Sequence, residues 1–137
     1  MFTVLPTPCV TWLLGRKPAA GFPSPADDFI EGQIDLSQFL IQHPAATFVM
    51  KVAGESMTGA GIHDGDYVLV DRSIEAIPGK IIVCVLDGEL TIKRLDKTAK
   101  GQWQLVAEHP DYPPILLDEE NPPQVWGVVT GCVRRYG

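Results

Sequence analysis

The sequence predicts a mostly β domain with one short helix and an extended N-terminal arm. Short apolar or alternating runs, separated by glycine, proline and acidic turn residues, recur from residue 46 onward. One segment, residues 35–40, combines a helix N-cap with helical spacing of apolar residues. Residues 1–33 hold five of the twelve prolines and show no sustained helical or strand period.

The arm, residues 1–33, comes first along the chain. Its segment "KPAAGFPSPADD" has proline or glycine at every few positions, which indicates an extended, exposed and flexible stretch. Trp12, Leu13 and Leu14 are apolar residues within the arm. We expect these three side chains to dock on the body or to lie in a dimer contact.

The body, residues 34–137, begins with the short helix, which has Asp35 as its N-cap and ends before Pro44. Strands are then expected at residues 46–53, 66–71, 80–86, 89–95, 102–108, 115–117 and 125–134. Asp87-Gly88 is a strong two-residue hairpin signal between two of these strands. The pattern is typical of an all-β domain.

Length, composition and charge limit the class of function. The chain has 137 residues, 45% hydrophobic and 20% charged, which is ordinary for one globular domain. A net charge of −6 disfavours a non-specific nucleic-acid binder, because such proteins present a basic surface. The longest apolar run, residues 81–86, is far shorter than the ~20 residues of a transmembrane helix. The apolar N-terminus lacks the charge order of a signal peptide, so we expect a cytoplasmic protein without membrane association.

The cysteines and the acidic turn do not indicate a metal site. Cys9, Cys84 and Cys132 form no Cys-x-x-Cys pair, which disfavours a disulfide framework and a zinc site. The Asp-Gly-Asp sequence at residues 64–66, with Asp71 beyond it, could supply carboxylate ligands but is more typical of a turn. We expect no metal and no cofactor.

Ser56 lies in the glycine-rich stretch "GESMTGAGIHDGD". A serine hydroxyl is a poor nucleophile until a neighbouring base removes its proton. Histidine is the usual base, and His63 is seven residues away, while His43 and His109 each precede a proline. None of the three has a convincing partner to orient it, so the sequence disfavours a Ser-His-Asp triad.

Lys93, in the strand-like segment "ELTIKRL", is the other candidate base. An exposed strand lysine is the simple alternative. At a pKa near 10.4, roughly one lysine in a few thousand is neutral at pH 7. Lowering that pKa to near 7 by burial costs about 4–5 kcal/mol. A catalytic Lys93 is therefore expected to be buried among apolar groups.

Ser56 in "GESMTGAGIHDGDYVLVDR" and Lys93 in "LTIKRL", 37 positions later, resemble the LexA/UmuD class of self-cleaving serine proteases. The resemblance continues through "GFPSPADDFIEGQIDLSQFLIQHPAATFVMKVAGESM" and "VWGVVTGCVRR" and covers most of residues 20–135. It implies a LexA-like catalytic β body with Ser56 as nucleophile and Lys93 as general base. It also implies self-cleavage between a small residue and a glycine, for which the arm offers Ala20 and Gly21.

The resemblance is closest to the UmuD branch, whose members are accessory subunits of error-prone translesion polymerases in the SOS response to DNA damage. It implies a homodimer and stimulation of cleavage by a RecA filament on single-stranded DNA. After cleavage, it implies partnership with a Y-family, UmuC-like polymerase. LexA and phage repressors carry a helix-turn-helix domain ahead of the same body. Only 33 proline-broken residues precede the body here, so sequence-specific DNA binding is not expected.

Other interpretations stay open on the sequence. A processing peptidase, such as a signal peptidase, also uses serine and lysine, but it is expected to carry a membrane anchor. The chain could also be an interaction module in which Ser56 and Lys93 are vestigial, or a fragment of a LexA-type repressor. Cleavage of the arm would separate the catalytic from the non-catalytic interpretation.

Overall fold

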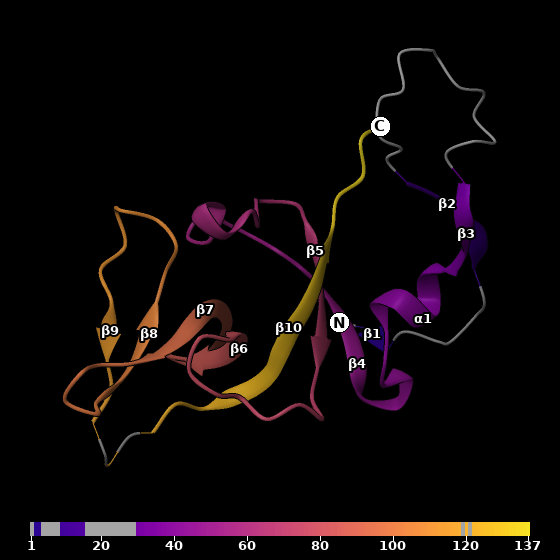
Figure 1. Cartoon of the computed structure of the whole chain (residues 1–137). Helices are drawn as coiled ribbons and strands as arrows, with labels where there is room; N and C mark the ends of the chain where they lie inside the picture. Colours follow the sequence, from indigo (N-terminus) through magenta and orange to yellow (C-terminus); the bar gives the residue numbers. More distant parts are fainter. Residues whose placement is uncertain (1, 4–8, 16–29, 119, 121) are drawn as a thin grey trace. The chain divides into compact units, whose positions relative to one another are not determined.

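The computed structural model describes residues 2–3, 9–15, 30–118, 120 and 122–137 (Figure 1). Its contacts divide the chain into a larger unit, Met1–Val4 with His43–Gly137, and a smaller unit, Leu5–Gln42. The short helix, residues 36–40, groups with the smaller unit.

One antiparallel sheet forms the larger unit. Eight strands of the described chain pair in the order β1-β4-β5-β10-β6-β7-β8-β9. They are β1 (Phe2–Thr3), β4 (Thr47–Lys51), β5 (Tyr67–Asp71), β6 (Ile81–Leu86), β7 (Glu89–Lys97), β8 (Trp103–Val106), β9 (Ile115–Leu116) and β10 (Val125–Val133). Two single-turn 3-10 helices, η2 (Pro44–Ala46) and η3 (Thr58–Ala60), lie in the connections before and after β4. No helix of the described residues is long and apolar enough to cross a membrane.

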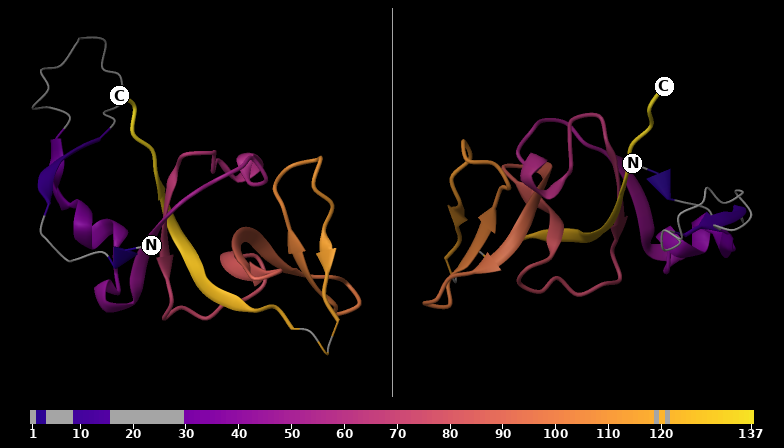
Figure 2. Two further views of the ribbon diagram at one scale, coloured as in Figure 1. Left: turned by 180° about the vertical axis from the view of Figure 1, so that it is seen from behind. Right: turned by 45° about the horizontal axis from the view of Figure 1, so that its top comes forward.

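Strand β10 joins the two halves of this sheet. It pairs with β5 along residues 128–133 and with β6 along residues 125–128. The register shifts once on each side, between Val129 and Gly131 and between Val125 and Gly127. Such irregularities bend a strand, and Figure 2 shows β10, in yellow, curving along its length.

Strands β6 and β7 form the expected hairpin. Asp87 and Gly88 have φ angles of +51° and +79°, and positive φ at both positions is what a type I′ turn requires. The turn fixes the register of the pair, which places Ile82 directly opposite Lys93. The side chains of directly opposite residues lie on the same face of the sheet.

Two apolar clusters cover the two faces of β6, because successive side chains of a strand alternate. Val83 belongs to one cluster, and Ile82 and Cys84 belong to the other. The first cluster consists of Val52, Met57, Ile62, Val68, Val70, Val83 and Ile92. The second consists of Ile82, Cys84, Leu95, Leu105 and Val128. Burial on both faces accounts for the unbroken apolar sequence "IIVCVL" of β6.

The described part of the smaller unit consists of two paired strands and a helix, β2 (Val10–Leu14), β3 (Ile30–Asp35) and α1 (Leu36–Leu40). The carboxylate of Asp35 accepts the N–H of Ser37 at 3.0 Å and of Gln38 at 3.4 Å. This satisfies backbone donors that a helix N-terminus leaves unpaired. The expected helix and its N-cap are confirmed.

The seven strands expected in the body are all present, and each bound agrees within two residues. The mostly β prediction is therefore confirmed. No strand is expected from the sequence in residues 1–33, and here the structure differs, because β1, β2 and part of β3 lie in that range. Strand β2, "VTWLL", pairs with residues about twenty positions later and has no polar alternation, so no local pattern indicates it.

Side chains of β2 are exposed, with Trp12 at 59% and Leu14 at 63%. The expected docking or dimer contact of Trp12, Leu13 and Leu14 stays a prediction. The division into a flexible arm of residues 1–33 and a body of residues 34–137 also stays a prediction.

Replacing Leu105 by alanine tests the second cluster. Leu105 is 1% exposed, so Leu105→Ala is expected to lower the free energy of unfolding by about 2–5 kcal/mol, through lost apolar burial and the cavity left behind. Leu116 on the neighbouring strand β9 is 58% exposed, so Leu116→Ala is expected to change the free energy of unfolding by less than about 0.5 kcal/mol. Urea unfolding followed by tryptophan fluorescence measures both. Equal losses would contradict the core position of Leu105.

Candidate active site

Ser56 lies in the connection between β4 and β5. Its neighbour Met57 is only 2% exposed and packs in the first apolar cluster. The carbonyl of Met57 accepts the N–H of Ala60 at 3.0 Å and of Ile62 at 3.2 Å. Met57 therefore anchors the turn in the core, while Ser56 beside it stays partly exposed.

The structure brings Ser56 and Lys93 together. The amine Nζ of Lys93, on β7, lies 3.3 Å from the hydroxyl Oγ of Ser56. It also lies 3.4 Å from Oγ1 of Thr91 and 3.2 Å from the carbonyl oxygen of Ile92. The oxygen partners are uncharged, and among the described residues no carboxylate forms an ion pair with Lys93.

Burial disfavours the charged form of the Lys93 amine. Lys93 is 9% exposed, and its burial lowers the pKa of the ammonium from the ordinary lysine value. Cys84, which is fully buried opposite Thr91 in the hairpin, is the titratable group that acts on the pKa of Lys93. Burial raises the pKa of the Cys84 thiol to about 11, so Cys84 is neutral at pH 7 and offers Lys93 no counter-charge. The expectation that Lys93 is buried is met.

A small cavity of about 130 Å³ opens beside Ser56. One wall is the chain at residues 50–54, and the other is Leu90, Thr91 and Ile92 at the start of β7. Both walls are short stretches of extended chain. A space of this size can take a short side chain, and the neighbouring backbone can align an extended peptide.

Three hydrogen bonds hold the Ser56 turn from outside. The carboxylate of Asp64 accepts the N–H of Gly54 at 2.8 Å. The carbonyl of Glu108 accepts the N–H of Gly59 at 2.7 Å, and the guanidinium of Arg134 donates to the carbonyl of Gly61 at 3.1 Å. The turn is thus fixed at points before and after Ser56 in the sequence.

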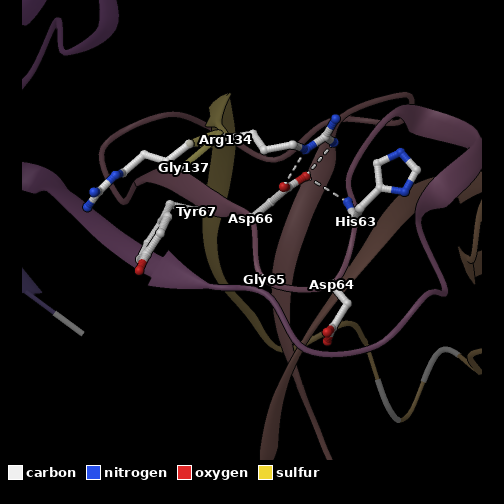
Figure 3. Close-up of a pocket in the computed structure, with 8 residues that line it drawn as sticks. His63, Asp64, Gly65, Asp66, Tyr67, Arg134 and Gly137 are labelled. Atoms are coloured by element: carbon white, nitrogen blue, oxygen red, sulfur yellow. Dashed lines mark hydrogen bonds and ion pairs between the residues drawn. The ribbon is translucent and has the colours of Figure 1, made fainter.

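The acidic turn has a structural role (Figure 3). The buried carboxylate of Asp66 accepts two hydrogen bonds from Arg134, at 2.7 and 2.8 Å, and one from the N–H of His63 at 2.8 Å. The bond from Arg134 is the largest influence that holds the pKa of Asp66 well below its usual range.

A second cavity of about 560 Å³ adjoins this ion pair and is lined by His63, Asp64, Gly65, Asp66, Tyr67, Arg134, Arg135 and Gly137. Ser56 does not line it.

Among the residues that the structure describes, neither a metal cluster nor a Ser-His-Asp triad forms around Ser56. Asp64, Asp66 and Asp71 have separate partners, and Asp71 bonds His43 Nδ1 at 2.6 Å and Ser73. Among the described residues no hydrogen bond joins a histidine ring to Ser56. The residue that the structure places against the serine is Lys93.

Sequence reasoning misses several residues of the site. Thr91 has a signal that could have found it, because it lies two residues before Lys93 and so on the same face of β7. Asp64, Glu108 and Arg134 have none, since they reach the Ser56 turn across 10 to 73 positions of sequence. Ala20 and Gly21, the expected cleavage site, lie outside the described residues.

Comparison with known proteins places this site in a family. Residues 12–130 match the family described as peptidase S24-like. The chain is 38% identical over 123 residues to Protein SamA of Salmonella typhimurium, covering 90% of this chain and 84% of SamA. It is 40% identical over 123 residues to Protein ImpA of Escherichia coli, covering 90% of this chain and 83% of ImpA. It is 40% identical over 117 residues to the LexA repressor of Dechloromonas aromatica, covering 85% of this chain and 57% of that repressor.

The match extends over the β2–β3 pair and nearly all of the sheet, and a LexA repressor is among the relatives, which confirms the resemblance stated from the sequence. This chain belongs to the peptidase S24-like family.

Proposed function

We propose that this chain is a self-cleaving serine endopeptidase, with Ser56 as nucleophile and Lys93 as general base. The observation that carries the proposal is the 3.3 Å separation between Ser56 Oγ and a buried Lys93 amine that has no carboxylate partner among the described residues. A lysine held in this way loses its proton more readily than an exposed one, and the family to which the chain belongs is described as peptidase S24-like.

The chemistry follows from these two groups. Neutral Lys93 accepts the hydroxyl proton of Ser56 as Oγ bonds to the carbonyl carbon of Ala20. The carbonyl oxygen becomes an oxyanion, which backbone N–H groups of the glycine-rich turn can stabilise. The carbon–nitrogen bond then breaks, and the Lys93 ammonium gives its proton to the departing Gly21 amine. Water hydrolyses the remaining ester, and both Ser56 and Lys93 return to their starting states.

The site suits a substrate that is attached to the same protein. The cavity of about 130 Å³ beside Ser56 has room for an alanine side chain. A tethered peptide has a far higher effective concentration than a free one, so few contacts are needed for its binding.

We propose further that the shortened chain is an accessory protein of translesion DNA synthesis in the SOS response. The support is the resemblance to the UmuD branch and the match to SamA and ImpA over most of their own length, against 57% of the LexA repressor. In this role the chain forms a homodimer in the cytoplasm, a RecA filament on single-stranded DNA stimulates the cleavage, and a Y-family polymerase binds the product.

Single replacements of the two groups test the catalytic proposal. Purified wild-type protein at pH about 9–10 is expected to lose its first 20 residues, since more Lys93 is neutral there. Ser56→Ala and Lys93→Ala are expected to slow this by on the order of 10³-fold or more. Lys97→Ala, which removes an exposed lysine of the same strand, is the matched control and should cleave like the wild type. Intact mass measures the product, and equal behaviour of all four proteins would support a non-catalytic module instead.

The lowered pKa of Lys93 also predicts how stability depends on pH. Between the folded pKa and the ordinary value near 10.4, the unfolded chain binds a proton that the folded chain does not. Unfolding in this window therefore takes up a proton, and the free energy of unfolding rises with pH. Lys93→Met removes the effect without opening a large cavity.

The comparison is best made in chains that cannot cut themselves, Ser56→Ala against Ser56→Ala with Lys93→Met. Urea unfolding of both across pH 7–10 is expected to show a difference that grows in favour of the lysine-containing chain. Because Cys84 and the other titrating groups are present in both chains, the difference isolates Lys93. A difference independent of pH would contradict a depressed pKa.

The proposed cleavage site has its own test. Gly21→Trp is expected to abolish the product that lacks 20 residues, because a bulky side chain keeps the backbone from approaching Ser56. Ser24→Trp, a change of similar size in the same arm, should leave the mass of the product unchanged except for the added atoms. A normal cut in Gly21→Trp would show that the bond lies elsewhere.

A further inference from the structure

Ser56 and Lys93 lie on separate segments, so something must set their distance. Ser56 belongs to the connection between β4 and β5, and Lys93 to the middle of β7. These segments are not neighbours in the strand order of the sheet, and no ladder of backbone hydrogen bonds joins them. Their relative position depends on contacts outside the ladder.

Glu108, two residues beyond β8, provides one such contact. Its carbonyl oxygen accepts the N–H of Gly59, three residues after Ser56, at 2.7 Å. The approach is so close that a Cβ atom at position 59 would lie 2.6 Å from this oxygen. Only glycine allows the turn to rest directly on the backbone of Glu108.

Arg94 holds Glu108 in place. Its Nε donates to Oε1 of Glu108 at 2.5 Å, and its Nη1 donates to the carbonyl of Gly79 at 2.7 Å. Gly79 in turn donates its N–H to the carbonyl of Leu95 on β7 at 2.7 Å. The planar guanidinium is therefore fixed at two points, which a flexible lysine ammonium would not achieve.

Arg94 directly follows Lys93, so the two side chains leave β7 on opposite faces. One face carries the amine toward Ser56, and the other carries the guanidinium toward Glu108. The hydrogen bonds that run from Arg94 through Glu108 to Gly59 thus begin one residue from Lys93 and end three residues from Ser56. The other two bonds to the turn, from Asp64 and from Arg134, do not involve β7.

We infer that Arg94 and Glu108 are positioning residues that fix Ser56 Oγ against Lys93 Nζ, an inference that rests on the proposed peptidase function. Both side chains are about one-third exposed, at 34% and 31%, and an ion pair with that exposure contributes little to stability. Its effect is on geometry, because a misplacement of about 1 Å can reduce a rate by about 100-fold.

Alanine replacements and a conservative replacement test the inference. Arg94→Ala and Glu108→Ala are each expected to slow self-cleavage by about 10- to 100-fold. The double variant should be no slower than the slower single one, since both residues act through the same contact. Glu108→Gln keeps an oxygen that accepts from Arg94 Nε and should retain most of the wild-type rate.

Two readouts separate positioning from a general loss of structure. Labelling of Ser56 by a small fluorophosphonate needs the Ser56–Lys93 contact but not the arm, and it should slow in parallel with self-cleavage. Amide exchange at Gly59 should become faster in Arg94→Ala and Glu108→Ala. All rates are measured well below the unfolding transition, where each variant is fully folded.

A matched control lies on the same two strands. Gln104 Nε2 donates to Asp96 Oδ2 at 2.6 Å between β8 and β7, two residue pairs farther along than Arg94. Among the described residues, no hydrogen bond joins this pair to the Ser56 turn. Asp96→Ala and Gln104→Ala should therefore cleave and label like the wild type.

Wild-type rates in Arg94→Ala and Glu108→Ala would overturn the inference and leave the proposed function intact, as would additive losses in the double variant. Wild-type protein that cuts no faster than Ser56→Ala would instead overturn the proposed function. In that case labelling of Ser56 and exchange at Gly59 still decide the inference, and wild-type values of both in Arg94→Ala would refute it.

Discussion

The burial of one amine is the constraint on which the rest of the site depends. A lysine ammonium is stable in water, and each unit by which burial lowers its pKa costs about 1.4 kcal/mol of folding free energy. Lys93 has no carboxylate among the described residues to offset this cost. The apolar burial in the two clusters on either side of the β6–β7 hairpin must offset this free-energy cost. The core and the chemistry of this small domain therefore depend on each other.

Ser56 is positioned differently from Lys93, through contacts of the connection that carries it. Ser56 is on a connection, where a partly exposed side chain can meet a peptide, but that connection is anchored by Met57 in the core and by polar contacts from Asp64, Glu108 and Arg134. Reactive groups commonly sit on such loops above a rigid scaffold. The acidic turn thus contributes through hydrogen bonds to the backbone and through the Asp66–Arg134 pair.

Local patterns were enough to predict much of this arrangement. Short stretches of sequence are enough to predict the strands of the body, the hairpin at Asp87-Gly88 and the helix capped by Asp35. Ser56 and Lys93 could be paired only through resemblance, since nothing local shows that residues 37 positions apart meet. The contact of Arg94 with Glu108 and the pairing of β2 with β3 could not be predicted, because they depend on how distant segments pack. Exposed apolar residues in β2 also remove the alternation by which strands are recognised.

The two-residue turn at Asp87-Gly88 has a consequence for how such a chain can diverge. Surface turns usually accept insertions and deletions, because their exposed residues make few buried contacts. Here the turn sets which face of β7 each side chain occupies, and a slip of one residue would send the amine of Lys93 to the side now held by Arg94. Changes of length at this exposed corner are therefore subject to the same selection as changes of the reactive groups themselves.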